Sequence, residues 1–554
     1  MNSLLLSLAR PFSLVAAWIG RRALRGALGT GSVLDLRLDG NVGDPLLLLS
    51  HLEFAAGRPG VRGVLLQVAG MGWGWATLQE WRAGIQRIRE KGVSVVVYAE
   101  SPGNAALYLS SVADKVIVPP MGEVSLLGVG GQLRFFGPAL ERLGLEFDVV
   151  SAGAYKSMGE SFTRRVASPQ NREATQLLVE ELQAELMSAL SLGRGVSESQ
   201  LEAAMAKGAL SPDEALAAGL IDRVAYESEI DEFLKELLGK ECARVDLGQL
   251  TKPLSLLRRA ERHSRGLPQI AVLHLRGNIT MGVEPGGRQR IAPPEVIPAL
   301  RALREDPMVQ AVVLAVNSPG GSVLASDLIW KEVQLLDQAK PVVAYFGDVS
   351  ASGGYYISAP ARAIYACPGT ITGSIGVVGG KLVTGAATAK LGIYSEAVGG
   401  GPMLGMYSSE EPFDPSQRAR FRARLQMAYK GFVERVAEGR KRTVEEIEPM
   451  AQGRVWAGAS ALEGGLVDGL GGLTQALDKA RELSKLHGPW SRKDLVVRPP
   501  ARFWAQFLPG GLLSLLAPQL KVLEPWLSLP PAAEMLLQSP GVALAVMPVE
   551  VDLN

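Results

Sequence analysis

Residues 61–68, VRGVLLQV, recur as VQAVVLAV at residues 309–316, an offset of 248 positions (309 − 61). Four further segments of the first half have counterparts in the same order in the second half. They are VLDLRLDGNV (33–42) with IAVLHLRGNI (270–279), VSVVVYAES (93–101) with KPVVAYFGD (340–348), ADKVIVPP (113–120) with ARAIYACP (361–368), and GALSPDEALAAGLID (208–222) with GRVWAGASALEGGLVD (453–468). A shared order of segments indicates an internal repeat, so the sequence predicts two copies of one unit.

Each copy alternates short apolar runs with helical patterns. The run at 61–68 is typical of a buried strand, and LQEWRAGIQRIREKG (78–92) after it has helical periodicity. The equivalent segment of the second copy, ASDLIWKEVQLLDQAK (325–340), has the same pattern. This alternation predicts right-handed crossovers and a largely parallel sheet, and therefore an α/β fold of tandem βαβ domains.

Five parts make up the predicted organisation. They are an N-terminal segment (1–28), a first domain (29–240), a linker (241–268), a second domain (269–486) and a C-terminal extension (487–554) that matches neither copy. Long amphipathic segments at 171–190 and 416–440 are predicted to be helical extensions that cover the sheets or bridge the domains. Their apolar stripes are candidates for subunit contacts.

The composition is globular, with 47% hydrophobic residues, 20% charged residues and a formal net charge of +1. No basic stripe indicates a nucleic-acid partner. The two cysteines, Cys242 and Cys367, are too far apart for a CxxC unit, and no cluster of metal ligands is visible. The sequence therefore predicts no metal and no other cofactor.

The N-terminal residues 1–20, MNSLLLSLARPFSLVAAWIG, are mostly apolar and are followed by three arginines. Arg10 and Pro11 interrupt the run, so the apolar stretch is too short to span a bilayer. A signal peptide has its positive charge before the apolar run, which is the opposite order. We expect an interfacial membrane anchor. An amphipathic helix packed on the domain is an equally consistent interpretation.

Two glycine-rich turns follow strands of the second copy. NSPGGS (317–322) follows VVLAV, and GDVSASGGYY (347–356) follows VVAYF. Open α/β sheets bind their ligands at the carboxyl ends of strands. Ser352 lies in the second turn among small residues that leave its hydroxyl accessible, and we predict that it is a nucleophile.

Glycines in these turns allow backbone N–H groups to approach a reacting carbonyl closely. An acyl-transfer enzyme needs such donors where negative charge develops. We predict that Gly353 and either Gly320 or Gly321 supply this oxyanion hole.

The two copies differ at the positions that carry chemistry. Asn104 of the first copy stands where the second copy has Ser352. The first copy contains GAYKSMGESF, in which Lys156 stands opposite Leu404 of the second copy. Because one copy has kept a serine and the other a lysine, we predict one composite site.

A histidine base is not indicated. The four histidines (His51, His263, His274 and His487) accompany no glycine-rich loop, and no GxSxG elbow occurs. A lysine can act as base if burial lowers its pKa by roughly 3–5 units. The segment GVVGGK (376–381) is not a phosphate loop, because Leu382 stands where a Ser or Thr would bind magnesium.

The combination of GAYKS (153–157) with NSPGGS, DVSASGGYY (348–356) and TGSIGV (372–377) resembles peptidase family S49, in the long, duplicated form of signal peptide peptidase A. The resemblance covers about residues 30–480. It implies a crotonase-like, or Clp-protease-like, fold in each copy. It also implies that Ser352 attacks a peptide carbonyl.

The same resemblance implies that Lys156 acts as base and then as acid, and that Ser374 orients its amine. The implied activity is a membrane-associated serine endopeptidase that degrades cleaved signal peptides and other unfolded or apolar peptides. The implied location is the bacterial inner membrane, with the catalytic domains on the periplasmic side. A homotetramer of eight domains is implied, enclosing a chamber with four sites.

Two other functions fit the same glycine-rich turns. Crotonase-like acyl-CoA enzymes direct paired N–H groups at a thioester and need no serine nucleophile. A catalytically silent membrane scaffold would need neither the serine nor the lysine.

Overall fold

The structure is a computed structural model of the chain. The residues that it describes are 22, 26, 28–29, 31–40, 44–239, 241–265, 267–282, 289–496 and 544–546. Most of the predicted N-terminal segment (1–28) and of the C-terminal extension (487–554) lies outside the described residues. Within the described part, no helix combines the length and the apolar character that crossing a bilayer requires.

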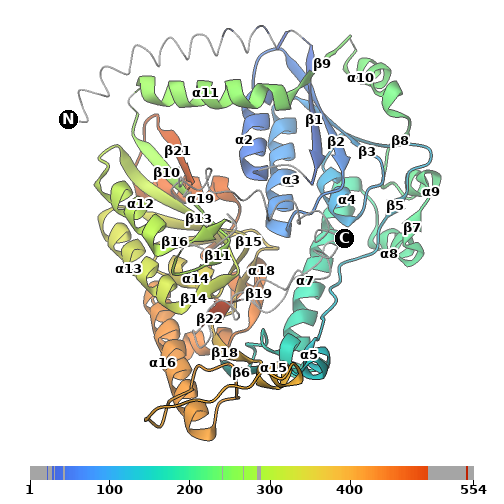
Figure 1. Cartoon of the computed structure of the whole chain (residues 1–554). Helices are drawn as coiled ribbons and strands as arrows, with labels where there is room; N and C mark the ends of the chain where they lie inside the picture. The colour runs from blue at the N-terminus through green and yellow to red at the C-terminus, as the bar shows by residue number, and fades with distance from the viewer. Residues whose placement is uncertain are drawn as a thin grey trace.

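The first copy is built on a six-stranded parallel sheet in the order β8-β4-β3-β2-β1-β9. Its strands are β1 (Ser32–Asp39), β2 (Val61–Ala69), β3 (Ser94–Ala99), β4 (Lys115–Val118), β8 (Arg223–Val224) and β9 (Ala243–Asp246). Helices cover both faces of this sheet (Figure 1). A strand that is buried on both faces needs apolar residues along its length, and the central strands β2 and β3 are mostly apolar.

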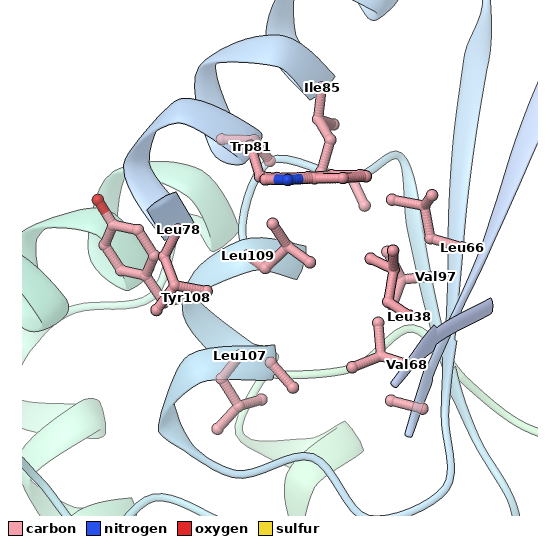
Figure 2. Close-up of a cluster of buried hydrophobic side chains, with 14 of the residues drawn as sticks. Leu38, Leu66, Val68, Leu78, Trp81, Ile85, Val97, Leu107, Tyr108 and Leu109 are labelled. Carbon is pink, nitrogen blue, oxygen red and sulfur yellow. The ribbon is translucent and has the colours of Figure 1, made fainter. Parts of the chain in front are cut away.

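Helices of the first copy pack on this sheet through large apolar side chains. They are α2 (Pro45–Ala56), α3 (Trp75–Glu90), α4 (Asn104–Ser110) and α7 (Pro169–Arg194) on one face, and α10 (Ile230–Leu238) on the other. Figure 2 shows Trp81 of α3 lying over Leu66 and Val97 of the sheet. The predicted helix at 78–92 is confirmed as α3.

The second copy repeats this architecture, and its main sheet has the order β19-β17-β15-β13-β10-β21, with β16 also paired to β15 and β20 paired to β16. Its strands are β10 (Gln269–Arg276), β13 (Val309–Ser318), β15 (Val342–Ala351), β16 (Ala363–Ala366), β17 (Ile371–Gly373), β19 (Val455–Ala457), β20 (Gly469–Leu470) and β21 (Ser491–Val496). Its principal helices are α12 (Pro293–Glu305), α13 (Val323–Ala339), α14 (Gly353–Ser358), α16 (Pro415–Arg440) and α19 (Leu473–Leu483). The predicted tandem α/β fold with parallel sheets is confirmed.

A third sheet joins the two copies. Its order is β12 (Arg290–Ile291), β11 (Asn278–Ile279), β14 (Gly320–Ser322), β22 (Leu544–Val546), β18 (Val377–Val383) and β6 (Glu146–Ala152). β6 belongs to the first copy, and it pairs antiparallel along its whole length with β18 of the second copy. Through this pairing, a strand of the first copy becomes part of a sheet of the second copy.

The remaining elements are short or peripheral. They are β5 (Val124–Ser125), β7 (Ala209–Leu210), α5 (Gly137–Leu143), α6 (Glu160–Thr163), α8 (Glu198–Lys207), α9 (Pro212–Ala217), η1 (Glu227–Glu229), α11 (Leu247–Arg265), α15 (Gly385–Lys390), α17 (Val444–Ile447), η2 (Glu448–Met450) and α18 (Gly458–Glu463).

The repeat extends further than the sequence pattern indicates. β9 pairs in parallel with β1, and β21 pairs in the same way with β10, with Ala243 and Ser491 separated by the same 248 positions (491 − 243). The predicted linker (241–268) is therefore β9 followed by α11, and the second sheet continues past residue 486 to Val496. Both edge strands are only partly buried and carry charged residues, so neither has an apolar run.

The two long helices bridge the copies, but their apolar stripes are already covered. α7 packs Leu178, Leu182 and Leu186 into the first core. α16 uses Phe421 and Phe432 in the second copy. The stripes predicted to make subunit contacts are therefore buried within the chain itself.

Two carboxylates, the buried Glu80 and the partly buried Asp348, connect the copies through helix ends. Asp348, near the end of β15, accepts hydrogen bonds from the Thr77 N–H (2.7 Å) and from Thr77 Oγ1 (2.8 Å) at the start of α3. Glu80 on α3 accepts a hydrogen bond from the Leu473 N–H at the start of α19. Each carboxylate supplies the acceptor that the first turn of a helix in the other copy lacks. Burial raises the pKa of both.

Candidate active site

Ser352 lies at the junction of β15 and α14. Its N–H donates to the Gly373 carbonyl (2.8 Å), and its own carbonyl accepts from the Tyr356 N–H (2.9 Å). Its φ of +56° is strained for a residue with a side chain. In the described part of the chain, five non-glycine residues have positive φ, and three of them, Ser352, Ser374 and Gln452, lie at this site. Such strain typically gathers at functional positions.

Lys156 reaches the same place from the first copy. It follows β6, whose pairing with β18 fixes where the next residues lie. The Tyr155 N–H donates to the Gln452 carbonyl (2.8 Å), and this bond ties the lysine loop to the second copy. The composite position expected from the complementary differences between the copies is therefore present in the structure.

The Lys156 amine contacts three oxygens. Nζ lies 2.8 Å from Ser352 Oγ, 2.9 Å from Ser374 Oγ and 3.0 Å from the Ser374 carbonyl oxygen. A neutral amine has two N–H donors and one lone pair. If both donors point to Ser374, the lone pair points to the Ser352 hydroxyl.

The cluster is shielded from water. Ser352 and Ser374 have 0% of their surface exposed, and Lys156 has 4%. Burial lowers the pKa of Lys156 well below its ordinary value of 10.5, and burial is the dominant cause. An amine that is neutral near physiological pH can accept a proton from a hydroxyl at 2.8 Å.

The predicted oxyanion glycines lie close to one another. A Cβ added at Gly353 would lie 3.1 Å from the Gly321 nitrogen, so the two backbones approach as only glycine allows. Gly320 and Gly321 have φ of +108° and +154° and belong to the short strand β14. The Gly320 N–H donates to Ser318 Oγ (3.1 Å).

The segment Gln452–Arg454 was missed by the sequence reasoning. The Arg454 carbonyl accepts from the Ser374 N–H (2.6 Å), and a Cβ at Gly453 would lie 2.7 Å from the Lys156 nitrogen. The Arg454 guanidinium lies 4.9 Å from the ring centre of Tyr155 and 4.4 Å from that of Trp456. It also pairs with Glu173 at 3.0 Å.

This arrangement makes Arg454 a positioning residue for both sides of the site. Its side chain holds the residue before Lys156, and its backbone holds Ser374. The first copy has Ala209 after the aligned glycine, Gly208. The same comparison between copies that separated Ser352 from Asn104 would have found Arg454.

We expect Arg454→Ala to lower kcat about 100-fold with a smaller change in KM, because a displacement of about 1 Å in a reacting group has that effect. Arg454→Lys, which keeps the charge but not the planar stacking on Tyr155 and Trp456, should recover only part of the loss. Steady-state kinetics with pH profiles check this. An unchanged kcat and an unchanged profile in Arg454→Ala would contradict the positioning role.

The positions equivalent to the site residues have structural contacts. Asn104 Nδ2 donates to the Gly128 carbonyl (2.9 Å), and its Oδ1 accepts from the Leu127 N–H (3.1 Å). Leu404, aligned with Lys156, is half-exposed. The first copy therefore uses an amide to fasten a loop where the second copy has its serine.

Histidines are not partners of the serine and lysine among the described contacts. His274 lies 3.2 Å from Asp494, and His51 lies 3.1 Å from Ser255. In the described residues, no group of three or more His, Cys, Asp or Glu side chains is placed to hold a metal ion.

A buried serine lies beside a lysine whose pKa is lowered by burial, at the carboxyl end of a parallel strand. Together with the family match that follows, this arrangement defines the class of protein as a serine peptidase. The model of peptidase family S49 matches the chain twice, at residues 87–240 and 334–487. The chain belongs to this family. The two matches fall in the two copies, in agreement with the duplication.

Two relatives match most of the chain, and a third matches about a third of it. A chloroplastic serine protease SPPA from Arabidopsis thaliana is 31% identical over 84% of this chain and 71% of its own length. Protease 4 from Salmonella typhi is 33% identical over 73% of this chain and 66% of its own length. A putative signal peptide peptidase SppA from Enterococcus faecium is 36% identical over 34% of this chain and 55% of its own length.

Proposed function

We propose that the chain is an endopeptidase in which Ser352 is the nucleophile and Lys156 the general base. The observation that carries this proposal is the 2.8 Å contact between Lys156 Nζ and Ser352 Oγ inside a buried site. Burial lowers the pKa of the amine and so favours its neutral form, and Ser374 offers acceptors for two N–H donors. The remaining lone pair can then take the proton of the Ser352 hydroxyl.

The reaction proceeds in two halves. Ser352 Oγ attacks the peptide carbonyl while its proton moves to Lys156, and Lys156 then gives that proton to the leaving amine. A water molecule next attacks the acyl-enzyme ester, with Lys156 again as base. The N–H of Gly353 and an N–H of the Gly320–Gly321 pair stabilise the oxyanion.

Cleaved signal peptides and other unfolded, apolar peptides are the substrates that we propose. The name of the Enterococcus faecium relative, a putative signal peptide peptidase, supports the first class. The site supports the second, because the Ser352 cluster is buried and the strands β14 and β18 lie beside it. A folded protein does not present an extended backbone to such strands.

A fluorophosphonate probe tests the proposal, because it reacts with an activated serine. Wild-type protein should form one adduct, which peptide mapping locates at Ser352, and Ser352→Ala should form none. Lys156→Ala should label far more slowly, since its serine has no base. An acyl-CoA enzyme or a silent scaffold would remain unlabelled, and an adduct at another serine would also contradict the proposal.

We further propose that the protein acts at the bacterial inner membrane, bound through residues 1–28, with its catalytic domains on the periplasmic side. The apolar start of the sequence supports this location. Vesicle sedimentation of the full chain and of a chain without residues 1–28 tests it. Equal sedimentation of both forms would contradict the role of this segment.

A homotetramer is proposed as the assembly. Apolar side chains in one segment, including Leu391, Tyr394 and Val398, are more than three-quarters exposed, and this supports a subunit contact there. We expect Tyr394→Ser with Val398→Ser to lose the mass of four chains in mass photometry. Leu192→Ser, an equally exposed leucine on α7, is the matched control and should keep it. A wild-type chain that is monomeric at micromolar concentration would contradict the assembly.

A further inference from the structure

The turn that holds Ser352 is preceded by a bulge in β15. The pairs of the β13–β15 ladder on either side of the bulge are Val316 with Phe346 and Ser318 with Ser350. Asn317 of β13 therefore lies opposite three residues of β15, 347–349. A bulge bends its strand and re-aims the residues that follow it. The direction in which the chain enters Ser352 thus depends on what holds residues 347–349.

Asn317 replaces the ladder partner that the bulge lacks. Its side-chain Oδ1 accepts a hydrogen bond from the Val349 N–H (3.2 Å). Gly347 lies against the same side chain, because a Cβ added at Gly347 would lie 3.1 Å from the Asn317 Cβ. Asn317 is also the first residue of the glycine-rich turn that contains Gly320. One side chain therefore connects the oxyanion turn to the strand of the nucleophile.

Asp348, in the middle of the bulge, faces the first copy. It accepts hydrogen bonds from the Thr77 N–H (2.7 Å) and from the Thr77 hydroxyl (2.8 Å). Thr77 is the third residue of α3, and the N-cap of this helix is Gly74, which has no side chain to accept from the first turn. Asp348 supplies the acceptor that an N-cap side chain normally provides. A Cβ at Gly74 would overlap the Asp348 carboxylate, so the glycine makes room for the contact.

The first copy has neither of these bulge residues. Asn317 is aligned with Ala69 (317 − 248), and Asp348, the last residue of KPVVAYFGD, is aligned with Ser101, the last residue of VSVVVYAES. The equivalent strands β2 and β3 pair without a register shift. The α/β fold of a copy therefore does not require the bulge, which belongs to the copy that carries the nucleophile.

We propose that Asp348 is a positioning residue, which the first copy holds through Thr77 so that the Ser352 hydroxyl and the oxyanion glycines lie at the correct separation. This inference rests on the proposed function, because it concerns the geometry of that site. The first copy then contributes more than Lys156 to the reaction, since the first turn of α3 fixes the strand that carries the nucleophile.

The contact acts over a short and well-held length of chain. Asp348 is four residues before Ser352, and the strand between them pairs with β13 on one side and with β17 on the other. A shift of the bulge is therefore passed along a paired strand instead of being absorbed by a loop. Asn317 connects the same bulge to the turn of Gly320. A displacement of about 1 Å between reacting groups can lower the rate about 100-fold.

A hollow of about 320 Å³ between the two copies is lined in part by Asp348, Asn317 and Thr77. A hollow with polar walls admits water, which can solvate the partners of a shortened side chain. We therefore expect variants at Asp348 to fold, so that the effect on catalysis can be measured.

Steady-state kinetics of three variants test the inference. Asp348→Ala removes both acceptors and should lower kcat about 10- to 100-fold, with KM changed less than about twofold. Asp348→Asn keeps an acceptor for the Thr77 N–H and can donate to the Thr77 hydroxyl, so it should keep at least about a third of the wild-type kcat. Thr77→Val removes only the hydroxyl and should lower kcat about threefold. A loss in Asp348→Asn as large as in Asp348→Ala would contradict the hydrogen-bonding role.

Glu80→Ala is the matched control. Glu80 is the other carboxylate that accepts from a helix start across the copies, the Leu473 N–H, but α19 does not lead into the catalytic turns. Glu80→Ala should lower the temperature of unfolding and keep the wild-type kcat. An equal loss of kcat in Glu80→Ala and Asp348→Ala would overturn the positioning role, because any weakening of the copy interface would then have the same effect. Thr77→Val and Glu80→Gln, which conserve side-chain size, decide the same question if either alanine variant does not fold.

A peptide aldehyde gives a readout that a merely structural role would not move. The Ser352 hydroxyl adds to the aldehyde, and the oxyanion that forms needs the glycine N–H donors, so the affinity depends on their separation. The Ki of the aldehyde should rise in Asp348→Ala by the same factor by which kcat/KM falls. The Ki of the same peptide with a terminal amide should change less than about twofold.

The outcomes separate this inference from the proposed function. A wild-type chain that hydrolyses peptides and reacts with a fluorophosphonate at Ser352, but whose Asp348→Ala variant has the same kcat and the same aldehyde Ki, would overturn the positioning role and leave the proposed function intact. A wild-type chain that shows neither reaction would contradict both.

Discussion

Ser352→Ala and Lys156→Ala are each expected to lower kcat/KM on an unfolded apolar peptide by about 10⁴-fold or more. The two groups act as one unit, because the serine proton has no acceptor without the lysine and the lysine has no task without the serine. The double variant should therefore lose no more activity than either single variant. Kinetics on a fluorogenic peptide with few charges measure this directly.

Ser374→Ala is the matched control, because it removes another buried hydroxyl that contacts the same amine. The Ser374 carbonyl remains at 3.0 Å from Nζ, so the amine keeps one of its two orienting acceptors. We expect a loss of about 10- to 100-fold. Circular dichroism and thermal unfolding should show all three variants folded. Retention of more than a tenth of the activity in Ser352→Ala or Lys156→Ala would contradict the dyad.

Much of the fold could be predicted because the chain contains two copies of one unit, which can be aligned with each other. Strands such as β2 and β13 are continuous apolar runs at a fixed offset, and such runs are what a parallel sheet covered on both faces requires. The same comparison separates Ser352 from Asn104 and Lys156 from Leu404. Neighbouring copies that differ at chemically active residue types point to one shared site, and the structure brings Lys156 to Ser352.

Other features depend on contacts that have no local pattern. In the sequence, β6 looks like one more strand of the first copy's own sheet. Only its register with β18 shows that it pairs with a strand of the second copy. β9 and β21 are half-polar edge strands, so their apolar periodicity is weak. Arg454 acts through ring faces and a backbone carbonyl, which form no motif, although the comparison of the copies distinguishes Arg454 from Ala209.

The apolar stripes of α7 and α16 show how an amphipathic pattern can mislead about assembly. A stripe states that one face of a helix is buried, but it does not identify the partner. Here Leu182 and Phe432 pack inside the chain, so the stripe says nothing about a neighbouring subunit. Several exposed apolar residues lie instead close together in an irregular segment around Tyr394, which has no periodicity to detect.

The pH dependence of kcat/KM should have an ascending limb whose pKa lies well below 10.5. Burial disfavours the charged amine of Lys156 and lowers its pKa, so the neutral form, which alone accepts the Ser352 proton, predominates above that lowered pKa. Below it, kcat/KM should fall about tenfold per pH unit, since one proton blocks the base. Profiles with a substrate that has no titratable group measure the limb.

The pH dependence of the free energy of unfolding is a second measure of Lys156 protonation. Between the lowered pKa in the folded chain and about 10.5 in the unfolded chain, the unfolded state binds one more proton, so the free energy of unfolding rises with pH. Lys156→Met, which keeps the apolar stem and removes the amine, should abolish this rise, whereas Lys207→Met, at an exposed lysine, should preserve it. Two results together would contradict this role of Lys156. They are a kcat/KM limb with a pKa near 10.5, and the same slope of unfolding free energy against pH in Lys156→Met and Lys207→Met. The amine would then be solvated and could not be the base at neutral pH.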